Sequence, residues 1–289
     1  MQAYIRMQYF VSPYRFIAIV FLFVICTIPV NGLSQVKSMP GNSEQPKKSL
    51  VNDQVSNSGK KFDLEMVYVE GGTFTMGCSA KKLSDCFSDE LPAHKVTVNG
   101  FYMGKFEITQ LQWRIVMGSN PQELNFKGCD NCPVERISWK DALEFIGKLN
   151  QLTGKNYRLP TEAEWEFAAR GGNKSKSFVY AGSNNADEVA WFKTNSSGRT
   201  HSKGGNKPNE LGIFDMSGNV WEWCQDWYDE GFYSLSAAQN PVNVKEAKYK
   251  VLRGSCWMAG KETLFVWKRY KNTPEDRGYY SGLRIVKDE

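Results

Sequence analysis

Histidine is nearly absent from this chain: His94 and His201 are the only two among 289 residues. Metal centres built on imidazole need several histidines, or histidines and cysteines at short spacing, and neither residue has such neighbours. No Gly-x-Ser-x-Gly nucleophile motif accompanies them. The sequence therefore excludes a histidine-rich metal site and gives no sign of a serine hydrolase. We expect His94 at a strand edge and His201 in a loop.

Clusters of like charge are also missing. The chain has 36 Lys and Arg against 31 Asp and Glu, a net charge of +5, spread along its length. Proteins that bind nucleic acid neutralise phosphates with a basic stripe or patch. We therefore expect no nucleic-acid partner. A hydrophobic content of 41% with 13% aromatic residues indicates a chain that folds around a core.

The apolar run over residues 16–30 is shorter than the ~20 residues that span a bilayer comfortably. Arg6 and Arg15 precede it, and small residues follow at 30–32, a pattern typical of an export signal. We predict a signal peptide over residues 1–32 and a periplasmic or secreted protein, with an uncleaved anchor as the alternative. Ile25 stands before Cys26 where a lipoprotein has a small residue, so we do not expect a lipoprotein.

Residues 33–61 are rich in Ser, Asn, Gln, Lys and Gly and have few large apolar side chains. Such a composition buries too little surface to offset the entropy lost on ordering. We predict a flexible linker over 33–61 and one folded domain over 62–289, with no internal repeat.

Three helices are predicted from capping boxes, in which a hydroxyl and a side chain three residues later satisfy free backbone N–H groups. The boxes are Thr109-x-x-Gln112, Ser138-x-x-Asp141 and Thr161-x-x-Glu164. Gly154 is expected to end the second helix and Gly171 the third. The second helix should pack one face on the core through Ala142, Leu143, Phe145, Ile146 and Leu149.

Strands are predicted over 64–69 and over 95–101, where Val96 and Val98 share a face. Two further strands, over 220–224 and 249–253, are expected to be neighbours in a sheet. Residues 171–209 are rich in Gly, Ser, Asn and Lys and predict a long irregular loop.

Seven cysteines, less Cys26 in the predicted signal, leave an even number in a chain expected to fold outside the reducing cytosol. We expect Cys78 and Cys86 to close a polar loop. Cys129 and Cys132 fit a zinc half-site, a redox pair or a tight structural bridge, and we favour the bridge; crossing between the two pairs stays open. Cys224 and Cys256 form either a third disulfide or two buried thiols.

Several blocks, in this order, resemble the formylglycine-generating enzyme family, also called the sulfatase-modifying-factor family. They are Gly71-Gly72-Thr73-Phe74-Thr75-Met76-Gly77, Tyr157-Arg158-Leu159-Pro160-Thr161-Glu162, Asp215-Met216-Ser217-Gly218-Asn219-Val220-Trp221-Glu222, Arg253-Gly254-Ser255-Cys256-Trp257 and Gly282-Leu283-Arg284-Ile285-Val286. The resemblance covers nearly the whole predicted domain. It implies a single α+β domain of C-type-lectin-like architecture, low in regular secondary structure, with loops held by metal ions and disulfides.

The resemblance also implies a calcium site, because Ca²⁺ favours carboxylates and backbone carbonyls in an irregular loop. Its ligands would be side-chain oxygens of Asp215 and Glu222 and carbonyl oxygens of Gly218 and Val220. The alternative is that Asp215 caps a turn and Glu222 is an ordinary strand residue. A second calcium site of the family has no good match in this chain.

Copper is not expected. In the family, two cysteine thiolates hold Cu(I), a soft ion, and oxygen chemistry converts a substrate cysteine to formylglycine. The two positions fall here on Ala259 and Leu264, neither of which can bind copper. We therefore assign no catalytic residue; a replacement pair formed by Cys224 and Cys256 is disfavoured.

Aromatic side chains are concentrated in the C-terminal hundred residues, and such side chains are favoured at binding surfaces. We expect Trp257, Trp267 and Tyr279 to line a groove that holds a peptide, protein or glycan. The sequence thus predicts an exported, calcium-stabilised, non-catalytic binding or assembly module, with envelope proteins as further partners. The alternatives are a purely structural envelope component and a formylglycine-generating oxidoreductase with atypical site residues.

Overall fold

The computed structural model describes residues 49–82 and 86–289, which belong to one unit by their internal contacts. The predicted signal peptide over 1–32 and the first part of the predicted linker lie outside the described residues. No helix in the described ranges has the length and apolar character needed to cross a membrane.

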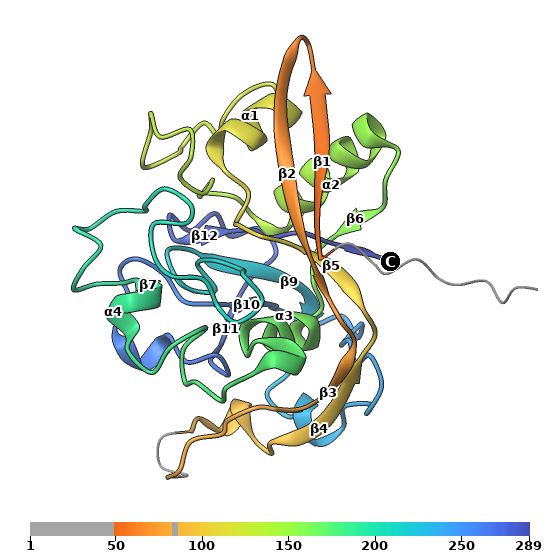
Figure 1. Ribbon diagram of the computed structural model, residues 1–289, viewed down its shortest axis with the longest axis vertical. Helices are drawn as coiled ribbons and strands as arrows, with labels where there is room; N and C mark the ends of the chain where they lie inside the picture. The colour runs from red at the N-terminus through yellow and green to blue at the C-terminus, as the bar shows by residue number, and fades with distance from the viewer. Residues whose placement is uncertain (1–48, 83–85) are drawn as a thin grey trace, which may run out of the picture. The chain divides into compact units, whose positions relative to one another are not determined.

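Two larger sheets organise the chain (Figure 1). The first has the order β1 (Leu50–Asn57), β2 (Lys60–Val69), β5 (Phe101–Gly104), β13 (Val286–Asp288) and β6 (Tyr157–Arg158). The second has the order β11 (Arg269–Asn272), β10 (Lys250–Arg253), β9 (Trp221–Trp227) and β12 (Ser281–Gly282). Two small sheets pair β3 (Gly72–Met76) with β4 (His94–Val98) and β7 (Ala190–Trp191) with β8 (Ser217–Gly218). The predicted α+β class is confirmed, as is the neighbouring position of β9 and β10.

The helices are α1 (Gln110–Met117), α2 (Trp139–Thr153), α3 (Glu162–Ala169) and the single turn α4 (Ala186–Val189). The three predicted capping boxes are confirmed, with Thr109, Ser138 and Thr161 each accepting from the backbone three residues later. Gly154 ends α2 in a left-handed conformation, as expected. The predicted core face of α2 is buried except for Leu143, which is 41% exposed.

The predicted linker is wrong for its described part, because residues 50–57 form strand β1. β1 pairs antiparallel with β2 through a turn at Ser58 and Gly59, both with positive φ. Its inward face carries Val55 and the buried Asp53, whose carboxylate accepts from Tyr157 Oη and Lys287 Nζ, each at 2.6 Å. Because the inward-facing Asp53 is polar, residues 50–57 lack the alternation of apolar and polar side chains that predicts a strand.

The strand predicted over 95–101 is two strands in different sheets. β4 ends at Val98, and β5 begins at Phe101 beside β2. The break is tight, since a Cβ on Gly71 would lie 2.7 Å from the backbone nitrogen of Gly100. Val96 and Val98 are both buried, as predicted. The expected long loop over 171–209 contains only α4, β7 and one 3₁₀ turn as regular structure.

Helix α3 contacts β9 and β10 on one side and β3 and β4 on another. Its apolar residues Ala163, Trp165 and Phe167 are at most 1% exposed. Its two inward carboxylates, Glu162 and Glu166, meet the guanidinium of Arg253 at 3.0 and 2.7 Å. Burial acts to raise the pKa of Glu162, but Arg269 and Arg253 hold it below its usual value. The helix is therefore fixed to the second sheet by charge as well as by packing.

Arg284, between β12 and β13, joins the two larger sheets. It donates to both carboxylate oxygens of Glu222 on β9, at 2.6 to 3.1 Å, and through Nη1 to the carbonyl of Gly104 on β5, at 2.9 Å. Trp165 of α3 donates to the same carboxylate at 2.7 Å. Both members of the Arg284–Glu222 pair are fully buried.

Replacing Arg284 by Lys is expected to lower the free energy of unfolding by about 1.5–3 kcal/mol, because lysine keeps the charge but loses the bidentate contact with Glu222. Arg277→Lys is the matched control: it alters an Arg–Asp pair on the surface and should cost no more than about 1 kcal/mol. Guanidinium denaturation followed by tryptophan fluorescence measures both. Equal losses in the two variants would contradict the structural role of Arg284.

Candidate functional site

The segment after β10 turns sharply back across the chain. Gly254 and Ser255 both have positive φ, 97° and 71°. The backbone N–H of Trp257 then donates to the carbonyl of Asn219 at 2.9 Å, so the segment runs beside the loop that precedes β9. It continues to Leu264, whose side chain is 1% exposed and packs with Val189 and Phe192 in a small apolar cluster.

A pocket of about 860 Å³ opens next to the end of this segment. We call it the Phe265 pocket; its walls include Cys86, Phe87, Val179, Glu262, Phe265 and Trp267. The rings of Phe265 and Trp267 stack with their centroids 4.8 Å apart. The ring of Tyr180 also stacks on Phe265, with a centroid distance of 5.5 Å. The guanidinium of Arg170 lies 5.7 Å from the Trp267 ring centroid. The pocket thus has an aromatic wall stiffened by stacking.

Three buried carboxylates, Glu107, Asp215 and Glu222, lie near the single guanidinium of Arg284. Burial raises the pKa of Asp215 to about 6, and burial with repulsion from Asp215 and Glu222 raises that of Glu107 well above its usual value. The Oδ1 atom of Asp215 is buried without a hydrogen-bond partner in the structure. Three ionised carboxylates here would carry more negative charge than the one guanidinium of Arg284 compensates.

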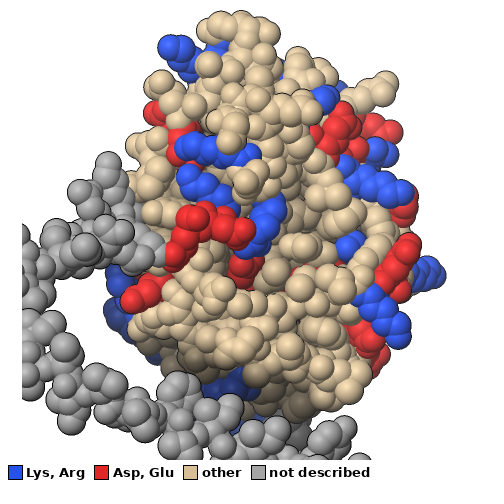
Figure 2. All heavy atoms as spheres, turned by 90° about the vertical axis from the view of Figure 1, so that its right-hand side faces the viewer, with Lys and Arg blue, Asp and Glu red and all other residues tan. Residues whose placement is uncertain are grey.

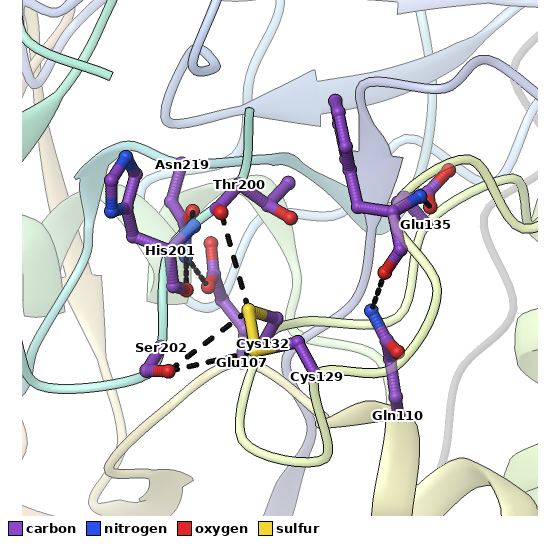
Figure 3. The surroundings of a disulfide bond; sticks show 10 residues. Glu107, Gln110, Cys129, Cys132, Glu135, Thr200, His201, Ser202 and Asn219 are labelled. Atoms are coloured by element: carbon purple, nitrogen blue, oxygen red, sulfur yellow. Dashed lines mark hydrogen bonds between the residues drawn. A yellow bond between two sulfur atoms is a disulfide. The ribbon is translucent and has the colours of Figure 1, made fainter. Parts of the chain in front are cut away.

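A disulfide lies beside this carboxylate group (Figure 3). The Cys129–Cys132 loop accepts the first N–H groups of α1: Gln110 donates to the carbonyl of Cys132 and Leu111 to that of Asp130. Ser202 approaches the sulfur of Cys129 at 3.6 Å. The neighbouring His201 N–H donates to the side chain of Asn219, which donates to Glu107 at 2.6 Å. The disulfide therefore helps position residues 200–204 against the carboxylates.

The fold and these residues agree with a known family. The model of the Sulfatase-modifying factor enzyme 1-like domain (FGE-sulfatase) matches residues 52–289. The chain belongs to this family. The resemblance drawn from the sequence blocks is therefore confirmed.

Relatives within this family carry different names. The Chaperone protein LppX of Paenibacillus barcinonensis is 34% identical over 275 residues, covering 78% of this chain and 90% of the relative. The Formylglycine-generating enzyme of Mus musculus is 26% identical, covering 78% and 75%. The Serine/threonine-protein kinase Pkn1 of Chlamydia trachomatis is 32% identical over 253 residues, which cover 38% of that protein.

Solved structures share the fold. The Treponema denticola variable protein 1 superposes with a TM-score of 0.73 at 25% identity, over 83% of this chain and 99% of the other. PvdO from Pseudomonas aeruginosa superposes with a TM-score of 0.69 at 24% identity, over the same shares.

The positions at which the family resemblance places copper ligands have no ligand atoms here. Leu264 is part of the core, and Ala259 is half-buried against a second apolar cluster. Neither side chain can coordinate a metal ion, so the residues present do not fit copper at these positions. The Phe265 pocket has one cysteine in its wall, Cys86, and its sulfur is bonded to Cys78.

Of the six cysteines outside the predicted signal peptide, four form disulfides and two are free. Cys78–Cys86 and Cys129–Cys132 are disulfides, so the two pairs do not cross, and Cys224 and Cys256 are buried free thiols. The two thiols belong to different apolar clusters. Cys224 lies within β9, whereas Cys256 lies just before Trp257 in the segment beside Asn219. Because both are free thiols, the third disulfide is not formed in this structure.

The predicted groove residues do not form one groove. Trp267 lines the Phe265 pocket, but Trp257 and Tyr279 lie elsewhere and contact each other, with ring centroids 5.9 Å apart. Phe126 meets Trp257 edge to face at 5.2 Å. The pocket instead uses Phe265 and Val179, which the sequence analysis did not single out. Their sequence signal is two short apolar runs, 178–181 and 264–267, and nothing in the sequence shows that these runs lie side by side.

Neither histidine is arranged for catalysis. His94 begins β4, its Nδ1 lies 3.0 Å from the carbonyl of Pro92, and its ring packs against Tyr233. His201 lies in a loop, stacked on Trp191 at 3.8 Å, with Nε2 2.7 Å from the carbonyl of Ser196. These are the strand-edge and loop positions expected from the sequence.

Of the two side chains predicted to bind calcium, one has a free oxygen and the other does not. The unpartnered Oδ1 of Asp215 suits an oxygen-seeking cation, whereas both oxygens of Glu222 already accept from Arg284 and Trp165. Over 49–82 and 86–289, no three His, Cys, Asp or Glu side chains are arranged to hold a metal ion. A cation here would therefore depend on Asp215 and backbone carbonyls, with Gly218 and Val220 as the expected sources.

The state of the free thiols can be measured by iodoacetamide labelling of the folded, unreduced protein. Thiolates react, and burial raises the pKa of Cys256 to about 11 and that of Cys224 well above its usual value. We expect no labelling of either residue at pH 7 or pH 9, and full labelling of both in guanidinium. Peptide mapping gives the sites; rapid labelling of the folded protein at pH 7 would contradict the assignment.

Proposed function

We propose that this chain is a non-catalytic member of the sulfatase-modifying factor enzyme 1-like family that binds a partner through the Phe265 pocket. The observation that carries the proposal is the replacement of both copper-ligand positions by Ala259 and Leu264. The pocket that opens next to Leu264, at Phe265, presents aromatic surface and no free thiolate. A pocket of this kind is suited to holding a group rather than to oxidising it.

The pocket favours an apolar or aromatic side chain of a polypeptide. Its volume is within the range of about 300–1,000 Å³ common for ligand sites. The stacked rings offer flat apolar area, while Lys81 and Glu262 lie in its walls and offer charge of both signs to a backbone or polar neighbour. The 34% identical relative that is named a chaperone protein supports a polypeptide over a glycan.

The proposed partners are exported or envelope proteins, since the N-terminal pattern predicts export to the periplasm or secretion. Nucleic acid is not proposed. Figure 2 shows Lys and Arg interspersed with Asp and Glu on the face it displays, with no broad patch of positive charge. Phosphate neutralisation would need such a patch.

Binding through the pocket is tested by selecting peptides from a random library on the wild-type protein. We expect the selected peptides to bind Phe265→Ala at least ~10-fold more weakly, because truncation removes a hot-spot ring. Tyr270→Ala is the control: this ring is 39% exposed and lies outside the pocket. Fluorescence polarisation measures the affinities. Equal binding to wild type and Phe265→Ala would refute the pocket.

A bound calcium ion is the second part of the proposal. Asp215 would hold it through Oδ1, with carbonyl oxygens from Gly218 and Val220. Glu222 would join them only by giving up a hydrogen bond that it now accepts from Arg284 or Trp165. The cation would supply positive charge to a group of three buried carboxylates that faces one arginine. It would thereby stabilise the loop that enters β9, without taking part in any reaction.

We expect saturating Ca²⁺ to raise the melting temperature by about 5–10 °C over EDTA-treated protein, because binding at 100 Kd adds ~2.7 kcal/mol. Asp215→Asn should lose most of this rise. Asp187→Asn, which alters an exposed pair with Lys261, should keep it. Differential scanning fluorimetry gives the values, and an identical melting temperature with and without Ca²⁺ in wild type would remove calcium from the account.

A further inference from the structure

A second cavity, of about 530 Å³, is lined by residues of α1, of α2 and of the segment between them, together with Arg277. We call it the Arg136 pocket. Its wall contains Met117, Glu123, Arg136, Ile137, Asp141 and Arg277. It is distinct from the Phe265 pocket and from the carboxylate group near Arg284, and shares no lining residue with either.

Arg136 is held in a backbone conformation that its side chain does not favour. Its φ is +60°, a left-handed value uncommon for residues other than glycine and asparagine. Its N–H donates to the carbonyl of Gly278 at 3.2 Å, and its neighbours Glu135 and Ile137 are fully buried. The surrounding chain thus fixes the strained residue. Strain of this kind, retained by the fold, is a reason to look for function.

The guanidinium of Arg136 is incompletely satisfied. Its Nε is buried without a hydrogen-bond partner in the structure. Its nearest carboxylate, Glu123, is 3.6 Å from Nη1, too far for a good hydrogen bond, and is 72% exposed. The ring of Tyr279 covers one face, with its centroid 5.4 Å away. The Nη atoms, by contrast, belong to a side chain that is 30% exposed and have only this loose ion pair, so a ligand that accepts from them closely would gain a charge-assisted hydrogen bond.

The other charges of the cavity are already paired. Arg277 donates to both oxygens of Asp141 at 2.7 and 2.8 Å, and Lys148 lies 2.7 Å from Glu144. The lining has three cations and three carboxylates, so its formal charge is zero. This balance favours a singly charged carboxylate over a doubly charged phosphate. Met117 and Pro121 add apolar wall beside the guanidinium of Arg136.

We propose that the Arg136 pocket binds a peptide carboxylate next to an apolar side chain, with the two Nη atoms of Arg136 donating to its two oxygens. The end of a guanidinium matches a carboxylate in this bidentate way. The apolar side chain packs on Met117 and Pro121, which are only partly buried. The carboxylate belongs either to a chain terminus or to an acidic side chain, and the experiment separates these two sources.

Three fluorescein-labelled peptides test the site in the full-length protein: Gly-Ala-Leu with a free carboxyl, the same peptide as the C-terminal amide, and the amide of Gly-Asp-Leu. We expect the free acid, the Asp-containing amide or both to bind at least ~10-fold more tightly than the neutral amide. The first result identifies a chain terminus as the ligand and the second an acidic side chain. Equal binding of all three, or no binding of any, would overturn the proposal.

Variants fix the residue. Arg136→Gln should weaken the carboxylate peptide at least ~10-fold, while Arg199→Gln, an exposed arginine elsewhere, should not. Glu123→Gln should tighten binding about twofold or more, because it removes the carboxylate that competes for Arg136. Should Arg136→Gln fail to fold, Arg136→Gly accommodates the positive φ, so it should keep the wild-type melting temperature yet lose the peptide. Unchanged affinity in Arg136→Gln or Arg136→Gly would overturn the assignment.

Discussion

The ion pair between Arg284 and Glu222 is the contact on which the arrangement of this domain most depends. It lies where the two larger sheets meet, and Trp165 of α3 donates to the same carboxylate. Removing one partner leaves a buried charge without compensation, which is among the most destabilising changes in a protein. The loop from Asp215 to Val220 leads directly into β9, so this pair also fixes the loop in which calcium is proposed.

The segment after β10 combines a tight backbone turn with an apolar residue, Leu264, at a position where the family resemblance expects a copper ligand. The backbone turns at Gly254 and Ser255 keep the course of the segment, while Leu264 packs into an apolar cluster. A buried leucine strengthens the core at a position where the family resemblance expects a reactive thiolate. The pocket alongside has an aromatic wall in which Phe265 stacks with Tyr180 and Trp267. An aromatic pocket without metal ligands is the arrangement on which the proposed binding function rests.

Local signals were sufficient to predict the three longer helices, but not the single turn α4. A capping box is a short-range arrangement of hydroxyl, backbone N–H and carboxylate or amide, so Thr109, Ser138 and Thr161 marked helix starts correctly. The family blocks identified the fold because they are distinctive in combination. The two disulfides followed from the even number and close spacing of the cysteines in each pair.

Long-range pairings were not visible in the sequence. Strand β1 was missed because its inward Asp53 is stabilised by Tyr157 and Lys287, far along the chain. The engagement of Glu222 by Arg284 was missed for the same reason, since the two residues are 62 positions apart. Aromatic content did not show which rings converge: Trp257 and Tyr279 contact each other, whereas Trp267 lines the Phe265 pocket.

The most direct test of the account is a turnover assay by mass spectrometry. The protein, loaded with Cu(I) under oxygen, is incubated with a peptide containing Cys-x-Pro-x-Arg, beside an active formylglycine-generating enzyme. Because Ala259 and Leu264 provide no thiolate and the free thiols Cys224 and Cys256 are buried apart, the account predicts no aldehyde product. Formation of formylglycine by this protein would contradict it.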